Sequence, residues 1–581
     1  MRFAVAVLFA GLLLQFASAH RVARGDPLVH TPLGAVRGTT MTSRSGKTIY
    51  AFRGMRYAVP PVGELRFKPP VPAAESWDGI KNATEDASSC PQSNDIFLSG
   101  PTSEDCLFLN VYSPRLPNRQ NNPRYPVLFF IHHGAWNGLS GQSSLVGPRY
   151  LMDEEIVLVT INYRLGALGF LSTGDSEVPG NNGFKDQLLA LKWVRDNIAS
   201  FGGNPETVTI YGYSAGAGSV QLHMASPRSA GLFHRAISSS GSALCGWAMT
   251  RDPMTQARRQ AKLLNCPHDN RATSKQIVDC LRGKDAEEIA KSYYSLTEWM
   301  LHPSVVFGAV IEAEGSSDQP FITEDPDLTF QRGNFAQVPW IIGTTNNEMM
   351  QTADVIVRNE TILEDFSQNF ERIVPIPFYF ERDTPASLRK SRRLKEFYFP
   401  DGRITRDSLQ PITDLFTDGI FFYGADRSVK LASLRSRSPV YYYMYVYRGR
   451  FGQMTAEPGM DRPRGAVHHD DLIHVFYGDG SDEGGFPFLT DEFPEAVTSK
   501  RLVRMWANFA RTGNPTPASN RNDDLIPTNW TPHTLNNLSY LEIGENLIMK
   551  RALRQERAAV WDDVYTDRVP FNQISSTKRK A

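Results

Sequence analysis

The segment from Val208 to Val220 constrains the fold of this chain more than any other part of its sequence. A β-branched run ends in Gly212-Tyr213-Ser214-Ala215-Gly216, and small residues then open a helical pattern. This order predicts a strand, a sharp turn and a helix, with Ser214 at the turn. The flanking glycines suit such a turn, because strand and helix approach closely and Ser214 takes a positive φ. Its hydroxyl would stand clear at the strand end, with the Ala215 N–H aimed at a developing oxyanion.

The GxSxG pattern is weak evidence by itself, since it also fits an ordinary turn with a helix N-cap. Its context is an alternation of short apolar strands and helices. We expect strands at 33–38, 48–54, 103–112, 125–131, 156–162, 207–213, 233–239, 338–343 and 441–447, and helical segments at 183–201, 253–264, 273–292, 405–435 and 498–511. This alternation predicts an α/β fold with a large, mostly parallel sheet flanked by helices, in which the first two strands form an antiparallel edge. Active sites in such sheets lie at the carboxyl ends of the strands.

A serine nucleophile needs a base and an acid, and both have candidates at predicted strand ends. Glu348 follows the strand at 338–343, although a lone glutamate there also fits a solvated loop. His468 is the candidate base, with His469 as its competitor. A metal site built from these histidines, Asp470 and Asp471 is disfavoured because neighbouring side chains point apart.

The turn after the strand at 125–131 is the candidate oxyanion hole. It reads His132-His133-Gly134-Ala135, and backbone N–H groups in such a small-residue turn can converge on one oxygen. The alternative is a simple glycine turn that ends the strand.

The N-terminus has the pattern of a secretory signal peptide over residues 1–19. Arg2 precedes an apolar run, and Ala17-Ser18-Ala19 fits a cleavage site. The run is too short to span a membrane, and no later segment is long and apolar enough. A signal peptide without a later membrane span predicts a secreted, extracellular protein.

The sequence shows no linker and no internal repeat, so residues 20–581 are expected to form a single domain.

The charge balance bears on possible partners, and the cysteines agree with a secreted protein. Lys plus Arg and Asp plus Glu both number 62, so the net charge is zero and nucleic acid is not an expected partner. An oxidising route favours disulfides, with short loops closed by Cys90 and Cys106 and by Cys266 and Cys280, although five cysteines leave other pairings open. Glycosylation sequons begin at Asn82, Asn359, Asn529 and Asn537.

These motifs together resemble the type-B carboxylesterase/cholinesterase family of α/β-hydrolases, and most of all its secreted insect carboxylesterases. The resemblance covers nearly the whole mature chain. It rests on Phe52-Arg53-Gly54, Ser103-Glu104-Asp105-Cys106-Leu107-Phe108-Leu109-Asn110, Asn162-Tyr163-Arg164, Asp186-Gln187, Phe201-Gly202-Gly203-Asn204-Pro205 and Gly212 to Gly216.

The resemblance implies a role for each candidate. Ser214 would be the nucleophile, Glu348 the acid and His468 the base. Oxyanion N–H groups would come from Gly134, Ala135 and Ala215, and Ser240 would lie next to the triad. The family's disulfides match Cys90–Cys106 and Cys266–Cys280, with Cys245 unpaired, and Arg66 with Glu104 resembles its structural ion pair. No metal or other cofactor is implied.

The chain departs from the family's pattern in four ways. His133 stands where the family's oxyanion turn usually has glycine, and Met349 follows Glu348 where glycine is usual. Tyr213 stands where cholinesterases have glutamate, and residues 91–105 contain no tryptophan to bind a quaternary ammonium. We therefore predict a serine esterase acting on small-molecule esters. The alternatives are a non-catalytic adhesion or ligand-binding member of the fold and a cholinesterase. A homodimer is left open.

Overall fold

The computed structural model describes residues 25–73, 76–93, 100–454, 465–478, 486–520, 523–566, 568–569, 571 and 573–574. The predicted signal peptide, residues 1–19, lies outside the described residues.

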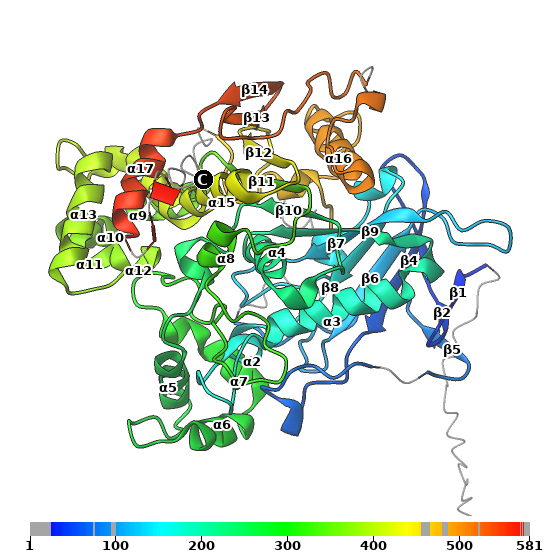
Figure 1. The fold of residues 1–581 in the computed structure, drawn as a ribbon, viewed down its shortest axis with the longest axis horizontal. Helices are drawn as coiled ribbons and strands as arrows, with labels where there is room; N and C mark the ends of the chain where they lie inside the picture. The colour runs from blue at the N-terminus through cyan, green and yellow to red at the C-terminus, as the bar shows by residue number, and fades with distance from the viewer. Residues whose placement is uncertain are drawn as a thin grey trace, which may run out of the picture.

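A single large sheet runs through the molecule (Figure 1). Within the described residues it has eleven strands, in the order β14-β13-β12-β11-β10-β9-β7-β8-β6-β4-β3. The strands are β3 (Thr39–Thr42), β4 (Thr48–Arg56), β6 (Phe108–Ser113), β7 (Tyr125–Ile131), β8 (Val157–Ile161), β9 (Gly203–Tyr213), β10 (Arg235–Ser239), β11 (Trp340–Thr345), β12 (Val440–Tyr445), β13 (Ser539–Ile543) and β14 (Leu547–Arg551). All neighbours from β8 to β13 pair in parallel, and the strands outside them pair antiparallel. This confirms the predicted mostly parallel sheet.

The two expected N-terminal edge strands belong to different sheets. The strand expected at 33–38 is β2 (Gly34–Arg37), which pairs with β1 (Leu28–Thr31) and β5 (Ile80–Asn82) in a small separate sheet. A tight turn explains the pairing of β1 with β2, because Thr31 Oγ1 accepts the N–H groups of Leu33 and Gly34. The strand expected at 48–54 is β4, which does lie near the edge of the large sheet.

Helices cover both faces of the sheet, and a further group gathers to one side of it (Figure 1). They are α1 (Ser143–Val146), α2 (Gly166–Phe170), α3 (Asn182–Asn197), α4 (Ala215–Ala225), α5 (Pro253–Leu263), α6 (Ser274–Arg282), α7 (Ala286–Lys291), α8 (Pro326–Arg332), α9 (Met350–Arg358), α10 (Glu360–Gln368), α11 (Phe370–Ile373), α12 (Pro375–Phe378), α13 (Pro385–Tyr398), α14 (Leu409–Thr417), α15 (Tyr423–Arg435), α16 (Glu495–Thr512) and α17 (Gln555–Val564).

The core forms two layers because side chains alternate across each strand. Leu128 and Phe130 of β7 pack with α16 on one face, where Trp506 is fully buried. Phe129 and Ile131 of the same strand belong to the core on the opposite face, with α3 and α4. Burial on both faces explains why the strand sequence is continuously apolar rather than alternating.

Two helical segments predicted as continuous are interrupted. The segment 273–292 breaks after Gly283, and the Asp285 side chain then caps α7 by accepting the N–H groups of Glu287 and Glu288 at 2.9 and 3.1 Å. The segment 405–435 splits into α14 and α15 around a π-helical turn, η8 (Asp418–Phe422).

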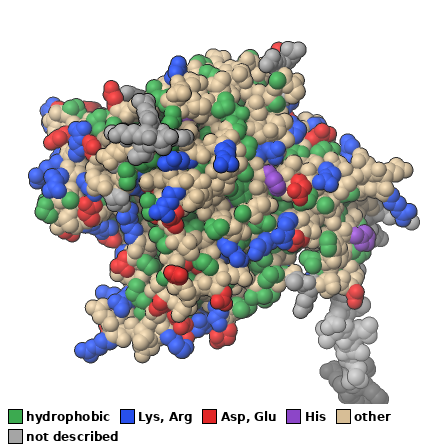
Figure 2. Space-filling view, viewed as in Figure 1, with side chains coloured by type: hydrophobic (Ala, Val, Ile, Leu, Met, Phe, Trp, Pro, Cys, Tyr) green, Lys and Arg blue, Asp and Glu red, His purple; other side chains and the backbone are tan. Residues whose placement is uncertain are grey.

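The surface shows Lys and Arg interspersed with Asp and Glu on the face drawn in Figure 2. Among the described residues, no helix combines the length and the apolar composition needed to cross a membrane.

Candidate functional site

Ser214 lies in the turn between β9 and α4. Its φ of 53° and ψ of −120° are unusual for a residue with a side chain, so the turn is strained. Close contacts enforce the turn, since a Cβ atom on Gly216 would lie 2.1 Å from the Ile131 carbonyl oxygen. Only glycine allows the start of α4 to press this closely against the end of β7. The strained turn leaves the Ser214 side chain at the carboxyl end of the sheet.

His468 and Glu348 complete a chain of hydrogen-bonding groups with Ser214. His468 Nε2 lies 3.0 Å from Ser214 Oγ, and its Nδ1 lies 2.6 Å from Glu348 Oε2. The Thr345 N–H donates to the other carboxylate oxygen at 2.8 Å. With Nδ1–H donating to Glu348, the lone pair of Nε2 faces the serine hydroxyl. The structure therefore brings together the three residues expected from the sequence, in the geometry of a nucleophile, a base and an orienting acid.

Burial shapes the protonation of this group. It lowers the pKa of His468, because a charged imidazole is costly away from water. Burial also raises the pKa of Glu348, against the lowering effect of the Ser240 hydroxyl and the Thr345 N–H. The imidazole is thus neutral near pH 7 and can accept a proton from Ser214.

Phe421 and Ser240 pack against the triad. The Phe421 ring stacks on His468 with 4.5 Å between centroids, and it comes from the π-helical turn η8. Ser240 follows β10 with a φ of 51°, and its N–H donates to the Gly343 carbonyl oxygen at 2.8 Å. The Ser240 hydroxyl lies close enough to Glu348 to lower the pKa of that carboxyl, so the structure places Ser240 beside the three candidate residues. No local sequence pattern indicated Phe421.

The turn after β7 has the backbone expected of an anion-binding loop. Gly134, Ala135 and Trp136 all have positive φ, at 106°, 53° and 53°. The Gly134 carbonyl oxygen accepts the N–H groups of Asn137 and Gly138, at 2.8 and 2.9 Å, so it points away from the site. A Cβ atom on Gly134 would lie 2.2 Å from the Gly138 carbonyl oxygen, which excludes a larger residue there.

This turn lies beside the serine because Ile131 pairs with Gly212 in the sheet. Within the described residues, the N–H groups of Gly134, Ala135 and Ala215 have no protein acceptor. Ser214, His468, Gly134 and Ala135 are half-buried, as are His133 and His469 beside them, so the site is open to solvent from one side. Three unpaired N–H groups next to an accessible serine are what stabilisation of a tetrahedral oxyanion needs.

Sequence reasoning missed a second layer beneath the triad. The Tyr213 hydroxyl donates to Asp471 Oδ1 at 2.8 Å and accepts the His469 N–H at 2.8 Å. The His469 ring lies beside His133, with 4.7 Å between centroids. Asp470 Oδ2 accepts the Val467 N–H at 2.8 Å. The two aspartates thus hold the loop that carries His468.

In the described part of the chain, no cluster of three or more His, Cys, Asp or Glu side chains is suited to bind a metal.

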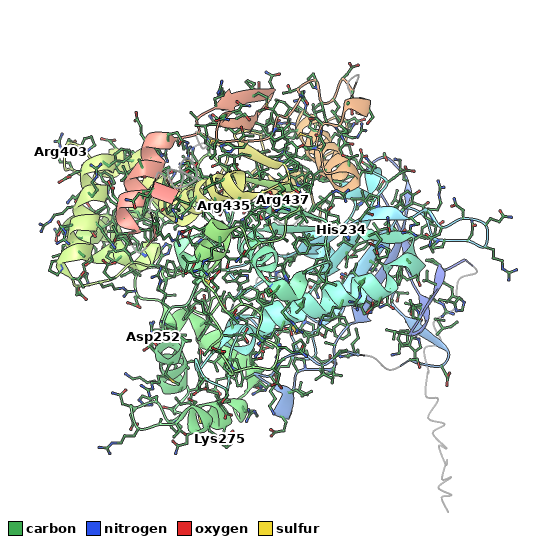
Figure 3. The ribbon with its side chains drawn as sticks, viewed as in Figure 1. His234, Asp252, Lys275, Arg403, Arg435 and Arg437 are labelled. Carbon is green, nitrogen blue, oxygen red and sulfur yellow. A yellow bond between two sulfur atoms is a disulfide. The ribbon has the colours of Figure 1, made fainter. Side chains whose placement is uncertain are left out.

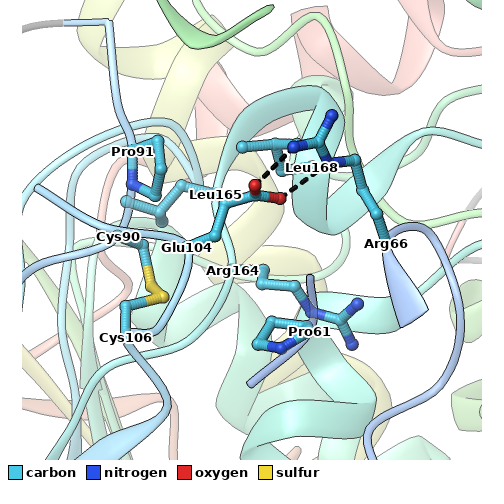
Figure 4. Close-up of a pocket in the computed structure, with 9 residues that line it drawn as sticks. All are labelled: Pro61, Arg66, Cys90, Pro91, Glu104, Cys106, Arg164, Leu165 and Leu168. Carbon is cyan, nitrogen blue, oxygen red and sulfur yellow. Dashed lines mark hydrogen bonds and ion pairs between the residues drawn. A yellow bond between two sulfur atoms is a disulfide. The ribbon is translucent and has the colours of Figure 1, made fainter. Parts of the chain in front are cut away.

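The structure links Cys90 to Cys106 and Cys266 to Cys280, and Cys245 is unpaired and buried. Beside the first disulfide, Arg66 Nε donates to Glu104 Oε1 at 2.7 Å (Figure 4). The cavity drawn there, of about 10 Å³, is water-sized and lies away from Ser214.

The four sequons differ in exposure. Asn82, Asn359 and Asn529 are exposed, whereas Asn537 is half-buried and donates to Ser539 Oγ at 3.3 Å. Glycosylation at these residues stays a prediction.

Comparisons with known proteins identify the family of this chain. The model of the carboxylesterase family matches residues 25–561. A juvenile hormone esterase of Tribolium castaneum is 36% identical over 511 residues, which cover 85% of each chain. Venom carboxylesterase-6 of Apis mellifera is 38% identical over 454 residues, covering 77% of this chain and 80% of the relative.

A solved structure shares the fold. The crystal structure of juvenile hormone esterase from Manduca sexta, with OTFP covalently attached, superposes with a TM-score of 0.79 at 28% identity. The alignment covers 93% of this chain and all of that one, which confirms the predicted α/β-hydrolase fold. The chain is therefore a carboxylic ester hydrolase and belongs to the carboxylesterase family.

Proposed function

We propose that this chain is a secreted serine esterase that hydrolyses small-molecule esters through an acyl-enzyme on Ser214. The observation that carries the proposal is the continuous hydrogen-bonded series from Ser214 Oγ through His468 to Glu348, at 3.0 and 2.6 Å. It lies beside three backbone N–H groups that have no acceptor in the described residues.

In the first half of the reaction, Ser214 Oγ attacks the ester carbonyl carbon as its proton passes to His468 Nε2. The carbonyl oxygen becomes an oxyanion, which accepts hydrogen bonds from Gly134, Ala135 and Ala215. The loss of one such donor typically costs about 3–4 kcal/mol in the transition state. Glu348 holds the imidazole and stabilises its positive charge. His468 then gives its proton to the alkoxide oxygen, and the alcohol leaves.

In the second half, His468 takes a proton from water, which attacks the acyl carbon. The tetrahedral intermediate collapses, the proton returns to Ser214 Oγ, and the carboxylic acid is released. Atoms and protons are conserved in each step, and water is the only co-reactant.

Simple esters are the favoured substrate class over choline esters. Tyr213 stands where cholinesterases have glutamate, and its hydroxyl is engaged by Asp471 and the His469 N–H. The nearby Asp471 carboxylate is buried, and both oxygens accept from tyrosines, at 2.8 and 3.1 Å. Neither group is available to a quaternary ammonium.

Secretion is supported by the signal-peptide pattern over residues 1–19 and by the paired cysteines. Exposed asparagines at 82, 359 and 529 suit glycosylation along the same route. Mass analysis of the mature N-terminus and of the peptides that carry these asparagines tests this part of the proposal.

The decisive experiment labels the secreted protein with a fluorophosphonate probe and maps the modified residue. We expect the label on Ser214, turnover of a short-chain ester by the wild type, and loss of both in Ser214→Ala. Because Ala keeps the turn free of added bulk, the variant should be secreted at the wild-type level. An unlabelled, inactive wild type would instead favour the non-catalytic alternative, and faster turnover of a choline ester than of its uncharged analogue would favour a cholinesterase.

A further inference from the structure

The side chain of Tyr213 joins the two elements that carry the nucleophile and the base. Tyr213 is the last residue of β9 and immediately precedes Ser214, and its side chain is fully buried. Its hydroxyl accepts the His469 N–H at 2.8 Å, and His469 immediately follows the base. One side chain therefore connects the residue before the nucleophile with the residue after the base.

Asp471 fixes the orientation of that hydroxyl. The Asp471 carboxylate accepts from Tyr213 at 2.8 Å through one oxygen and from Tyr443, on β12, at 3.1 Å through the other. Asp471 is 4% exposed, so water does not compete for these bonds. With its proton directed to Asp471, the Tyr213 oxygen presents a lone pair to the histidine loop.

The loop that carries His468 and His469 needs this hydrogen bond because its backbone is strained. His469 has a φ of 79°, a conformation that side-chain-bearing residues rarely adopt. The N–H of His468 donates to the Glu348 carbonyl oxygen at 3.1 Å, which fixes the loop on the acid's side. Tyr213 supplies the matching tie on the nucleophile's side, and its ring lies 5.2 Å from the His468 ring.

We propose that Tyr213 is a positioning residue whose hydroxyl ties the histidine loop to the strand end and thereby sets the separation between Ser214 Oγ and His468 Nε2. This inference rests on the proposed roles of Ser214 and His468. The Tyr213 hydroxyl bonds to the Asp471 carboxylate and the His469 N–H, and not to Ser214 Oγ or to a ring nitrogen of His468. It acts on the proton transfer alone, so its removal should slow the chemical step and leave ester binding intact.

The test compares Tyr213→Phe with Tyr443→Phe. Each variant keeps its ring and loses one buried hydrogen bond to Asp471, but only Tyr213→Phe also releases the His469 N–H. We expect kcat for a short-chain ester to fall about tenfold in Tyr213→Phe with KM within twofold of wild type. The rate of fluorophosphonate labelling at Ser214 should fall by a similar factor. In Tyr443→Phe, kcat should stay within threefold of wild type although the melting temperature drops.

Several results would overturn the inference. One is a kcat within twofold of wild type in Tyr213→Phe, and another is an equal loss of kcat in both variants. If Tyr213→Phe does not fold, Asp471→Asn gives the second measurement, because it preserves the shape but weakens the acceptor. Its kcat should fall at least threefold at unchanged KM, and an unchanged kcat contradicts the inference. A wild type without label on Ser214 would instead reject the proposed function.

Discussion

At the scale of single residues, the site depends on backbone conformations that most side chains avoid. Ser214, Ala135 and His469 have φ values of 53°, 53° and 79°. Such conformations persist only where the surrounding structure imposes them. Here the sheet pairing of β7 with β9, the glycine contacts and the Tyr213 hydrogen bonds do so. The strain thus lies where the proposed mechanism requires the serine hydroxyl, the oxyanion donors and the base to meet.

The identity of the base is tested by two adjacent substitutions. His468→Ala should lower kcat by several orders of magnitude, because no other group then accepts the Ser214 proton. His469→Ala should keep kcat within about tenfold of wild type, because its backbone N–H, which bonds to Tyr213, remains. Steady-state kinetics of both variants with one short-chain ester make the comparison. An inactive His469→Ala beside an active His468→Ala would show the assignment to be wrong by one residue.

The residues of the proposed triad could be found from the sequence because each ends or follows a predicted strand. The contacts that support these three residues could not be found from the sequence. Tyr213 and Asp471 are 258 positions apart in the chain, and no local pattern pairs them. The ring of Phe421 reaches His468 only because η8 is π-helical, which depends on distant packing. Sequence patterns report strand ends well, but they report poorly which side chains meet beneath them.

At the scale of elements, the strands could be predicted from the sequence more accurately than the helices. Most buried strands were predicted closely, since continuous apolar runs of five to seven residues leave little choice. Two were not: the strand expected at 103–112 begins only at Phe108, and β13 was not predicted. The helical segment 405–435 was predicted as one piece because its periodicity is continuous. A Cβ atom on Gly419 would lie 2.4 Å from Trp561 and 2.6 Å from Phe378, so tight packing against two aromatic rings accompanies the π-helical turn. This packing involves residues far away in the sequence.

The disulfide between Cys266 and Cys280 stabilises a helical corner away from the site. It joins residues 14 positions apart, from the loop after α5 to the last turn of α6, and Lys275 of α6 is labelled at the lower rim of the view in Figure 3. Closing a loop of this length contributes about 3 kcal/mol by restricting the unfolded chain. We expect Cys266→Ala/Cys280→Ala to lower the free energy of unfolding in denaturant by about that amount, with kcat unchanged.

The control for this pair is the wild-type protein carried through the same denaturation with both disulfides verified by peptide mapping. Equal unfolding midpoints for the two proteins would contradict the stabilising role of the bond. A large loss of kcat would show instead that α5 and α6 contribute to the site.

At the scale of the whole molecule, one sheet extends from β3 near the N-terminus to β14 near the C-terminus. We therefore propose that residues 20–581 fold as a single domain. Such a domain should respond to pH as a unit, and its buried histidines set part of that response.

His223 in α4 offers a clear case. It is fully buried between Ser229 Oγ and Gln187 Oε1, and burial lowers its pKa to about 3. In the unfolded chain a histidine has a pKa of about 6.5, so below that pH the unfolded state binds a proton that the folded state does not. Its contribution to stability is therefore present above pH 6.5 and is lost as pH falls toward 3, by about 2 kcal/mol at pH 5.

The His223→Gln variant should remove this pH-dependent contribution to the free energy of unfolding. We expect the difference in unfolding free energy between pH 7.5 and pH 5 to be about 2 kcal/mol smaller than in the wild type, whatever the absolute cost of the substitution. Urea denaturation at the two pH values provides the measurement. The control is His234→Gln, which replaces a half-buried histidine (Figure 3) and should change the difference less. Parallel pH profiles for wild type and His223→Gln would rule the mechanism out.

The distances along the chain between the three triad residues also bear on how the protein is made. Ser214 lies 254 residues before His468, and Glu348 lies 120 before it. During synthesis, the serine and the oxyanion turn emerge long before the base exists. On the proposed mechanism, a nascent or truncated chain that ends before His468 has a serine without its base, and it cannot hydrolyse esters. On this mechanism, activity first arises when the loop after β12 docks onto Glu348 and Tyr213, so turnover reports that docking.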